Sequence, residues 1–383
     1  MAAVQRQPAM LRALSSGFLT FWCIIAFFPI FWITVMSVKN PLDALAKSPV
    51  QVFFGPRTLA QGDGLSIIDI VLGLITIGLL IYIGRVRLAG WVKQYGLPNA
   101  PRISWVLAVI LFCIATITVL FGILPLLSSI LNSIGGPLGT NIVGLTTEHY
   151  EAVWFERGFT RNFTNSLIVT AGVVTVSLTI GTLAGYALAR SGGEIAFWLL
   201  VAALIFRALP HSVLVAGYLP VFIKSADILR PILGEAAPTL YGQPWAVIIV
   251  LVAINQPFTI WLLRSFFQNI PEELDEAAKV DGCTHFQAFR LVIIPVMWPG
   301  VITAGLFSFL LAYNDFLVTS LLLDGQNMTM VPAIANMFNR ETNASDEVQA
   351  IAAAVSITAP LFLLVVLFQR QLVSGLTAGA VKG

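Results

Sequence analysis

The stretch "EELDEAAKVDG", residues Glu272 to Gly282, places five acidic side chains in a chain that is otherwise largely apolar. If the stretch is helical, one face holds four residues at i, i+3, i+4 and i+7, namely Leu274, Ala277, Ala278 and Asp281. That face is narrow and built mainly of small side chains, which allows another backbone to come close. A helix resting on a membrane surface favours Lys and Arg on its polar face. The acids here therefore favour docking to a partner protein.

Signals for helix ends divide this segment into two parts. Asn269 is expected to cap a helix whose N3 residue is Glu272, and Gly282 is expected to end it in the left-handed conformation. Residues 284–287 form a second capping box, which opens a helix expected to run to a break before Pro295. The pattern predicts a helix, a glycine corner and a second helix.

The composition of the whole chain predicts an all-α integral membrane protein. Of its 383 residues, 57% are hydrophobic and only 10% are charged, against about 25% charged in a typical soluble domain. The net charge of +2 is too small to suggest a nucleic-acid partner. The three cysteines and three histidines are dispersed and give no metal-binding spacing.

Apolar segments of about 20 residues identify candidate membrane spans. The segments that qualify are 14–36, 66–84, 103–130, 165–189, 196–222, 244–263, 298–322 and 349–369. The first is too long for a signal-peptide core, so it is interpreted as an uncleaved anchor. Gly181 and Gly185 form a GxxxG pair, which predicts a helix-contact face.

Lys and Arg placement predicts the orientation of these spans. With the N-terminus inside, 12 of these cations lie on the cytoplasmic side and eight on the other. Loop 85–102 is the strongest anchor, since it carries four cations and no acid. Both termini are then cytoplasmic, and the acidic segment, within loop 264–297, faces the cytosol.

The acidic segment also carries a recognisable motif. Glu276-Ala277-Ala278, three residues, Gly282, nine residues and then residues 292–295 (VIIP) resemble the EAA loop of ATP-binding-cassette (ABC) importer permeases. In that family the loop, here 268–297, contains the coupling helix that fits a groove on the ATP-hydrolysing subunit. The resemblance implies a charged contact by Glu276, close packing by the two alanines and a corner at Gly282. It also places Leu274, Asp281 and Pro295 in the coupling site.

Three further stretches are similar to the carbohydrate-uptake branch, the maltose-type or MalG-like permeases. They are "NSLIVTAGVVTVSLTIGTLAGYALAR" (165–190), "YNDFL" (313–317) and "GLTAGAVKG" (375–383). This resemblance implies that tail 370–383 reaches between two ATPase subunits. The implied tail contacts are Gly375, Leu376, Thr377, Gly379 and Lys382.

The family core has six spans, so the resemblance implies an insertion in this chain. Residues 1–50 would form the N-terminal tail and first span, 51–150 an inserted two-span hairpin, and 151–383 the permease core. The expected total is about eight transmembrane helices in a bacterial inner membrane.

The resemblance also implies partners. They are a second, MalF-like permease subunit, a MalK-like ATPase dimer, a periplasmic or extracellular sugar-binding protein and membrane lipid. The chain has no G-x-x-x-x-G-K-[ST] sequence, so ATP and Mg are expected only on the ATPase. We expect a transport subunit with no catalytic residues and no cofactor of its own. An α-glucoside resembling maltose, trehalose or sucrose is the implied cargo, with sugar alcohols and glycerol phosphates left open.

Polar residues at membrane depth are candidates for the substrate path. They are Arg207, Asn255, Asn314 and Asp315. Their hydrogen-bonding groups suit a sugar, but an internal network that includes an Arg207–Asp315 pair is the favoured interpretation.

Two other classes of protein remain as alternatives. An ion-coupled secondary sugar carrier would show inverted repeats and paired broken helices, and it has no use for a docking motif. An intramembrane enzyme would need converging catalytic side chains, whereas the histidines lie near membrane edges or in loops.

Overall fold

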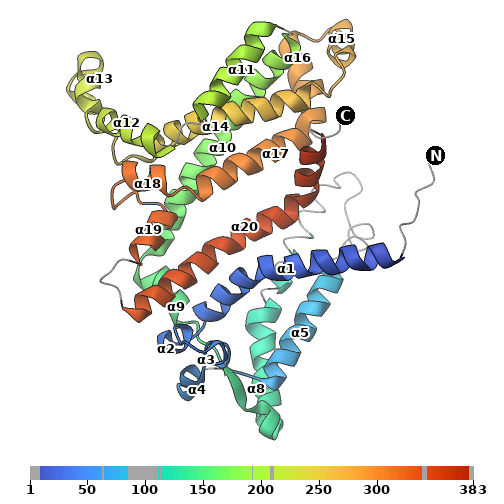
Figure 1. Ribbon diagram of the computed structural model, residues 1–383, viewed down its shortest axis with the longest axis vertical. Helices are drawn as coiled ribbons and strands as arrows, with labels where there is room; N and C mark the ends of the chain where they lie inside the picture. Colours follow the sequence, from blue (N-terminus) through green and yellow to red (C-terminus); the bar gives the residue numbers. More distant parts are fainter. Residues whose placement is uncertain are drawn as a thin grey trace. The chain divides into compact units, whose positions relative to one another are not determined.

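The structure is a computed structural model that describes residues 9–62, 64–84, 108, 111–112, 114–116, 118–191, 193–207, 211–338 and 343–378. It divides into two compact units, drawn together in Figure 1. The first unit comprises Met1–Tyr150 with Thr342–Ala352, and the second comprises Glu151–Glu341 with Ala353–Gly383.

The first unit begins with a long apolar helix, α1 (Ala9–Ser37). It is followed by α2 (Pro41–Ala44), α3 (Pro49–Phe54), α4 (Pro56–Ala60), β1 (Gly64–Ser66), α5 (Ile67–Tyr82), the π-helical turn η2 (Val119–Ile123), α8 (Leu124–Ile134), the 3₁₀ turn η3 (Gly136–Gly139), β2 (Asn141–Gly144) and α9 (Glu148–Glu151). The two strands pair antiparallel, with Gly64 opposite Gly144 and Leu65 opposite Val143. This two-stranded ribbon is an addition to the all-α fold expected from the sequence.

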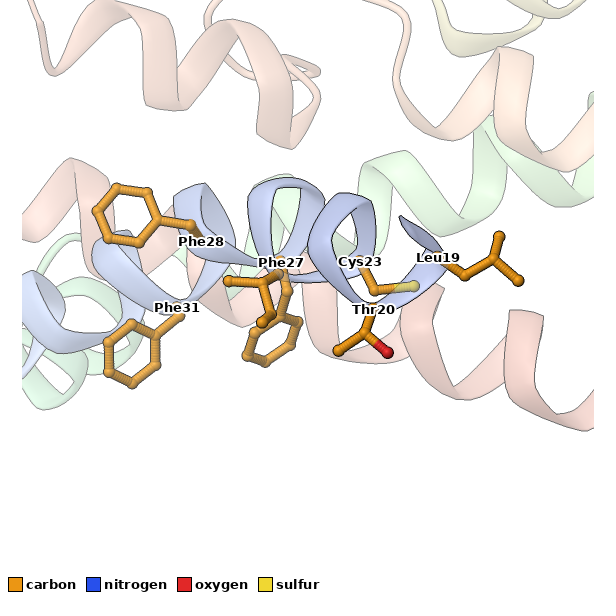
Figure 2. Close-up of a pocket in the computed structure, with 7 residues that line it drawn as sticks. Leu19, Thr20, Cys23, Phe27, Phe28 and Phe31 are labelled. Carbon is orange, nitrogen blue, oxygen red and sulfur yellow. The ribbon is translucent and has the colours of Figure 1, made fainter. Parts of the chain in front are cut away.

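Figure 2 shows one apolar face of α1, whose residues line an open pocket. The labelled residues are Leu19, Thr20, Cys23, Phe27, Phe28 and Phe31. The Thr20 hydroxyl donates a hydrogen bond to the Ser16 carbonyl at 2.8 Å, inside the same helix. With its polar group satisfied, this face suits lipid chains.

Helices α5 and α8 pack against each other. Asp69 joins them: its Oδ2 accepts from the Ser66 amide at 2.8 Å, and its Oδ1 accepts from Asn132 Nδ2 at 3.0 Å and from the Ser128 hydroxyl. The start of α5 therefore lies next to the later part of α8, so the two described helices of the predicted hairpin run antiparallel. Most of the predicted span 103–130 lies outside the described residues.

A polar cluster ties the segment after α1 to the segment after β2. Lys39 is 1% exposed, and its ammonium donates to the Gly144 carbonyl. His149 Nε2 lies 2.8 Å from the Lys39 carbonyl oxygen. Burial lowers the pKa of the Lys39 ammonium, and the Asp43 carboxylate nearby opposes that shift. These contacts hold residue 39 next to residues 144–149, so the intervening segment begins and ends at the same place in the first unit.

The second unit is built around three long helices, α10 (Phe159–Arg190), α14 (Pro244–Phe267) and α17 (Ile294–Tyr313), which pack on one another. The remaining elements are η4 (Ala152–Glu156), α11 (Glu194–Arg207), α12 (His211–Ile223), α13 (Ser225–Leu233), η5 (Gly234–Ala236), α15 (Glu273–Val280), α16 (His285–Ala288), η6 (Phe289–Ile293), α18 (Leu317–Leu322), α19 (Met330–Asn336) and the second-unit part of α20 (Ala344–Ala378). Figure 1 places α15 and α16 together at one end of α14 and α17.

Small residues allow α10 and α14 to approach closely. A Cβ added at Gly181 would lie 2.7 Å from Thr259 Cγ2, and one at Gly185 would lie 3.1 Å from the backbone nitrogen of Arg264. The GxxxG pair therefore forms the helix-contact face predicted from the sequence.

This close contact makes Gly185→Leu a test of the core. The new side chain meets the backbone of α14, which cannot shift alone, and overpacking of this kind costs about 1–3 kcal/mol. We expect a lower yield of monodisperse protein in detergent and a lower midpoint of thermal aggregation. Gly217→Leu in α12 is the matched control, because a Cβ there has no heavy atom within 4 Å. Equal behaviour of the two variants would contradict this account of the α10–α14 contact.

Five helices among the described residues are long and apolar enough to cross a membrane. They are Ala13–Ser37, Phe159–Arg190, Pro244–Phe267, His285–Tyr313 and Ala344–Gln369. The predicted span 66–84 corresponds to α5, which has 16 residues, and the predicted span 196–222 contains two helices, α11 and α12. The described residues thus support a multi-pass helical membrane protein without establishing eight spans.

The predicted boundaries 298–322 are wrong. This span begins earlier, at His285, and ends at Tyr313. Asn314 leaves the helical conformation, and the Asp315 carboxylate accepts a hydrogen bond from the Thr319 amide at 2.9 Å, where the separate helix α18 begins. A side chain that satisfies the first amides of a new helix favours such a break.

Candidate functional site

Helix α15 projects between α14 and α16 and ends as the sequence predicts. Gly282 has φ +88°, a conformation that favours glycine. Its amide donates to the Lys279 carbonyl at 3.0 Å, and the Cys283 amide donates to the Ala278 carbonyl at 3.0 Å. The second of these bonds is the 6→1 hydrogen bond that defines a Schellman motif. The predicted glycine corner is confirmed.

The predicted cap at Asn269 is wrong. The residue at the N-cap is Glu272, and its side chain makes no capping hydrogen bond. The Asn269 amide instead donates to the Phe266 carbonyl at 3.1 Å, so Asn269 belongs to the turn that ends α14. Helix α15 starts after Pro271, too far along the chain for the Asn269 side chain to act as its cap.

The second capping box is confirmed, but the predicted break before Pro295 is wrong. The Thr284 hydroxyl accepts from the Gln287 amide at 3.3 Å, and Gln287 Oε1 accepts from the Thr284 amide at 2.8 Å. The helix then continues through the π-helical turn η6 into α17. Pro295 lies at the start of α17, directly after this wider turn, where its missing amide is tolerated.

One side of α15 faces its own chain. Asp275 is 5% exposed, and its Oδ2 accepts from Arg190 Nε at 2.8 Å while its Oδ1 accepts from the Tyr186 hydroxyl at 2.6 Å. Ala278 is also buried, and α15 packs against η6. The sequence interpretation, which grouped Asp275 with outward acids and Ala278 with the docking face, is wrong on both residues.

The opposite side of α15 is exposed. Its exposed acids are Glu272, Glu273, Glu276 and Asp281. Exposed apolar side chains accompany them: Val280 is 87% exposed, Leu274 and Ala277 are also exposed, and Phe286 of the neighbouring α16 is 64% exposed. We call these eight residues the α15 outer face. It combines negative charge with apolar area, a composition that suits a partner protein better than water alone.

An apolar cluster supports the inner side. It joins α14, the turn after it, η6 and α17 through Leu262, Leu263, Phe267, Ile270, Phe289, Ile293, Met297 and Ala304. Tyr186 of α10 extends it: its ring lies 5.5 Å from that of Phe267 and 4.8 Å from that of Phe289, between centroids. The turns on either side of α15 are therefore packed into the core formed by α10, α14 and α17.

Two of the polar residues predicted for a substrate path, Asn255 and Asn314, form hydrogen bonds within the chain. Asn255 is buried and donates to the Ser308 hydroxyl at 2.7 Å, which links α14 to α17. Asn314 is exposed and donates to the Leu310 carbonyl at 3.1 Å. The side chain of Arg207 lies outside the described part of the structure, so its predicted pairing with Asp315 stays a prediction.

The predicted tail contacts fall at the end of α20 or beyond it. Gly375, Leu376 and Thr377 belong to its last turns. Gly379 and Lys382 lie outside the described residues.

Comparison with known proteins identifies the family. Residues 177–377 match the family of binding-protein-dependent transport system inner membrane components. The chain belongs to this family, and it is a transport subunit, the permease of an ABC importer, rather than an enzyme. The match includes α14, α15, α17 and the C-terminal part of α10, the parts that form the candidate site.

Its relatives include named sugar permeases, which confirms the resemblance to the carbohydrate-uptake branch. The trehalose transport system permease protein SugB of Mycobacterium tuberculosis is 33% identical over 242 residues, 62% of this chain and 83% of that protein. The diacetylchitobiose uptake system permease protein DasC of Streptomyces coelicolor is 34% identical over 241 residues, 62% of this chain and 82% of that protein. The trehalose/maltose transport system permease protein MalG of Thermococcus litoralis is 30% identical over 219 residues, 57% of this chain and 74% of that protein.

Proposed function

We propose that this chain is the MalG-like permease of an ATP-driven carbohydrate importer, and that the α15 outer face is where the ATPase docks. The observation that carries this proposal is the outer face itself. An acidic and apolar surface stands at the end of the core helices, on a helix whose other side is fixed to its own chain. Such a surface complements a basic groove with an apolar floor.

The rest of the complex follows from this role. We assign to it a MalF-like second permease, a MalK-like ATPase dimer that alone binds ATP and Mg, and a sugar-binding protein on the opposite side of the membrane. The chain would lie in lipid with both termini cytoplasmic. Its C-terminal residues, from 370 onward, would also contact the ATPases. Residues 51–150 would be an inserted hairpin, and residues 151–383 would be the permease core.

Transport would follow from movement of α15. When the ATPases bind ATP and approach each other, the docked helix moves with them. A short turn joins α15 to α14, and a second turn joins it to α16, which leads through η6 into α17. Displacement of α15 would therefore tilt these spans. The substrate path would open alternately to the two sides of the membrane.

The cargo we propose is an oligosaccharide such as an α-glucoside. Relatives named for trehalose, for trehalose and maltose, and for diacetylchitobiose support a di- or oligosaccharide. Within the chain we assign Asn255 to helix packing, since it bonds to Ser308. Arg207, Asn314 and Asp315 stay candidates for the sugar path.

Photo-crosslinking tests the docking proposal. A photoreactive amino acid at Val280 is expected to capture the ATPase subunit in membranes. The same residue at Ile232 of α13, which is 80% exposed, is the matched control and should not capture it. Uptake should require the permease pair, the ATPase and the sugar-loaded binding protein together. Uptake by this chain alone, or capture of the ATPase only at position 232, would overturn the proposal and favour an ion-coupled carrier.

A further inference from the structure

Arg190, the last residue of α10, contacts three successive segments of the chain. Its Nε and Nη2 both lie 2.8 Å from Asp275 Oδ2 in the first turn of α15. Its Nη1 donates to the carbonyl of Phe267, at the end of α14, at 3.3 Å, and to that of Ile270, in the following turn, at 3.2 Å. One guanidinium thus connects α10, the end of α14 and α15.

Tyr186, one helical turn earlier in α10, completes this set. Its hydroxyl donates to Asp275 Oδ1 at 2.6 Å, so both carboxylate oxygens are engaged. The Arg190 guanidinium carbon lies 5.8 Å from the centroid of the Tyr186 ring. The same ring contacts Phe289 of η6, which leads into α17. The contacts of Asp275 therefore lead to all three long helices of the core.

Burial indicates that these contacts serve geometry more than stability. The side chains of Arg190 and Asp275 are 16% and 7% exposed. Desolvation offsets most of the Coulomb energy of a buried pair, and such a pair is a poor source of net stability. The planar guanidinium fixes the orientation of α15 relative to α10, because its donors form a rigid fork that binds several acceptors at once.

The connections of α15 explain why direction matters. The helix has only eight residues and is joined to α14 and α16 by short turns. If those turns could bend freely, an ATPase pulling on the outer face would deform them before it moved the spans. A rigid contact between α15 and the end of α10 removes that freedom.

We propose that Tyr186, Arg190 and Asp275 form a coupling latch, a set of positioning residues that transmits displacement of α15 to α10, α14 and α17. The proposal rests on the docking role proposed above. The latch residues do not touch the ATPase or the sugar. They determine how much of the movement of α15 reaches the transmembrane helices.

The test uses the complete transporter in proteoliposomes, with the permease pair, the ATPase dimer and the sugar-loaded binding protein. The variants are Asp275→Asn, Arg190→Lys and Tyr186→Phe, with Asp227→Asn on the exposed α13 as matched control. The measured quantity is the number of ATP molecules hydrolysed per sugar imported, alongside the Val280 cross-link yield.

We expect Asp275→Asn and Arg190→Lys to raise that ratio about 10- to 100-fold, the penalty typical of a small misplacement. Arg190→Lys keeps the charge but loses the fork, so it separates geometry from charge. Tyr186→Phe keeps the ring contacts and should raise the ratio less. Asp227→Asn should leave it unchanged.

A merely structural role predicts a different result. Loss of folded complex lowers hydrolysis and uptake in proportion, which leaves the ratio unchanged and overturns the latch. If the wild-type cross-link at position 280 fails, the docking proposal itself falls. If the cross-link at position 280 is preserved and the number of ATP molecules per sugar is unchanged in the variants, the latch proposal is overturned and the docking proposal stands.

Hydrogen exchange on the purified permease provides a second measurement for variants that assemble poorly. The latch predicts faster exchange over Glu273–Val280, with exchange over the buried middle of α14 unchanged. Equal acceleration in both segments would mean general destabilisation and would also overturn the latch.

Discussion

Glu276→Lys is expected to abolish sugar uptake while leaving the permease itself folded. Glu276 is exposed on the α15 outer face, so its replacement should change stability by less than about 0.5 kcal/mol. At the docked interface, however, a cation would face a basic groove. Like charges brought together at an interface cost several kcal/mol, so affinity for the ATPase should fall roughly 30- to 1000-fold.

Co-purification of the ATPase with the tagged permease measures this effect, and the thermal aggregation midpoint of the permease serves as the stability readout. Glu235→Lys is the matched control, since it makes the same charge change at another exposed acid, in η5. It should retain both the ATPase and uptake. Were Glu276→Lys to retain them as well, the outer face would not be the docking surface.

Salt gives an independent check of the same contact. Charge pairs at an exposed rim are screened at high ionic strength. Retention of the ATPase by the wild-type permease should therefore fall as salt rises. Glu276→Lys should show the reverse trend, because screening weakens repulsion as well as attraction. A salt-independent complex would indicate that apolar contacts such as Val280 and Phe286 supply the affinity.

The features of this site that could be predicted from the sequence are the local ones. Gly282 and the Thr284–Gln287 box act within a few residues, so their structures follow from residue type and spacing. The orientation of Asp275 depends on a residue 85 positions earlier in the chain, Arg190. Periodicity alone cannot show which acid a distant cation will contact, and the sequence therefore assigned Asp275 to the wrong side of α15.

The spans show the same division. Segments with uninterrupted apolar character, such as 165–189 and 244–263, fall inside observed helices. Hydropathy gave the wrong boundaries for span 298–322, because backbone geometry and not the loss of apolar residues sets both ends of that helix. The π-helical turn η6 carries the helix past Pro295, and the Asp315 contact with the Thr319 amide ends it before the apolar run stops. Neither event changes the hydropathy of the segment.

Gly282→Pro is expected to uncouple the transporter by moving α15 as a whole. Proline fixes φ near −65°, whereas Gly282 has φ +88°, and proline also removes the amide that donates to Lys279. The chain cannot turn at this point, so the outer face loses its orientation relative to α16. Proline cannot adopt this conformation, so the turn must rearrange, and we expect ATPase retention and uptake to be lost together.

A graded series separates backbone strain from crowding. No heavy atom lies within 4 Å of a Cβ added at Gly282, so a small side chain meets no crowding from its own chain and its backbone preference decides the outcome. Asparagine tolerates the left-handed region better than alanine, which pays about 1–2 kcal/mol there. Uptake should fall in the order Gly, Asn, Ala, Pro, with exchange of the Glu273–Val280 amides rising in the same order. If alanine and asparagine reduced uptake equally, contact with a partner at this position would explain the loss, because strain would distinguish the two.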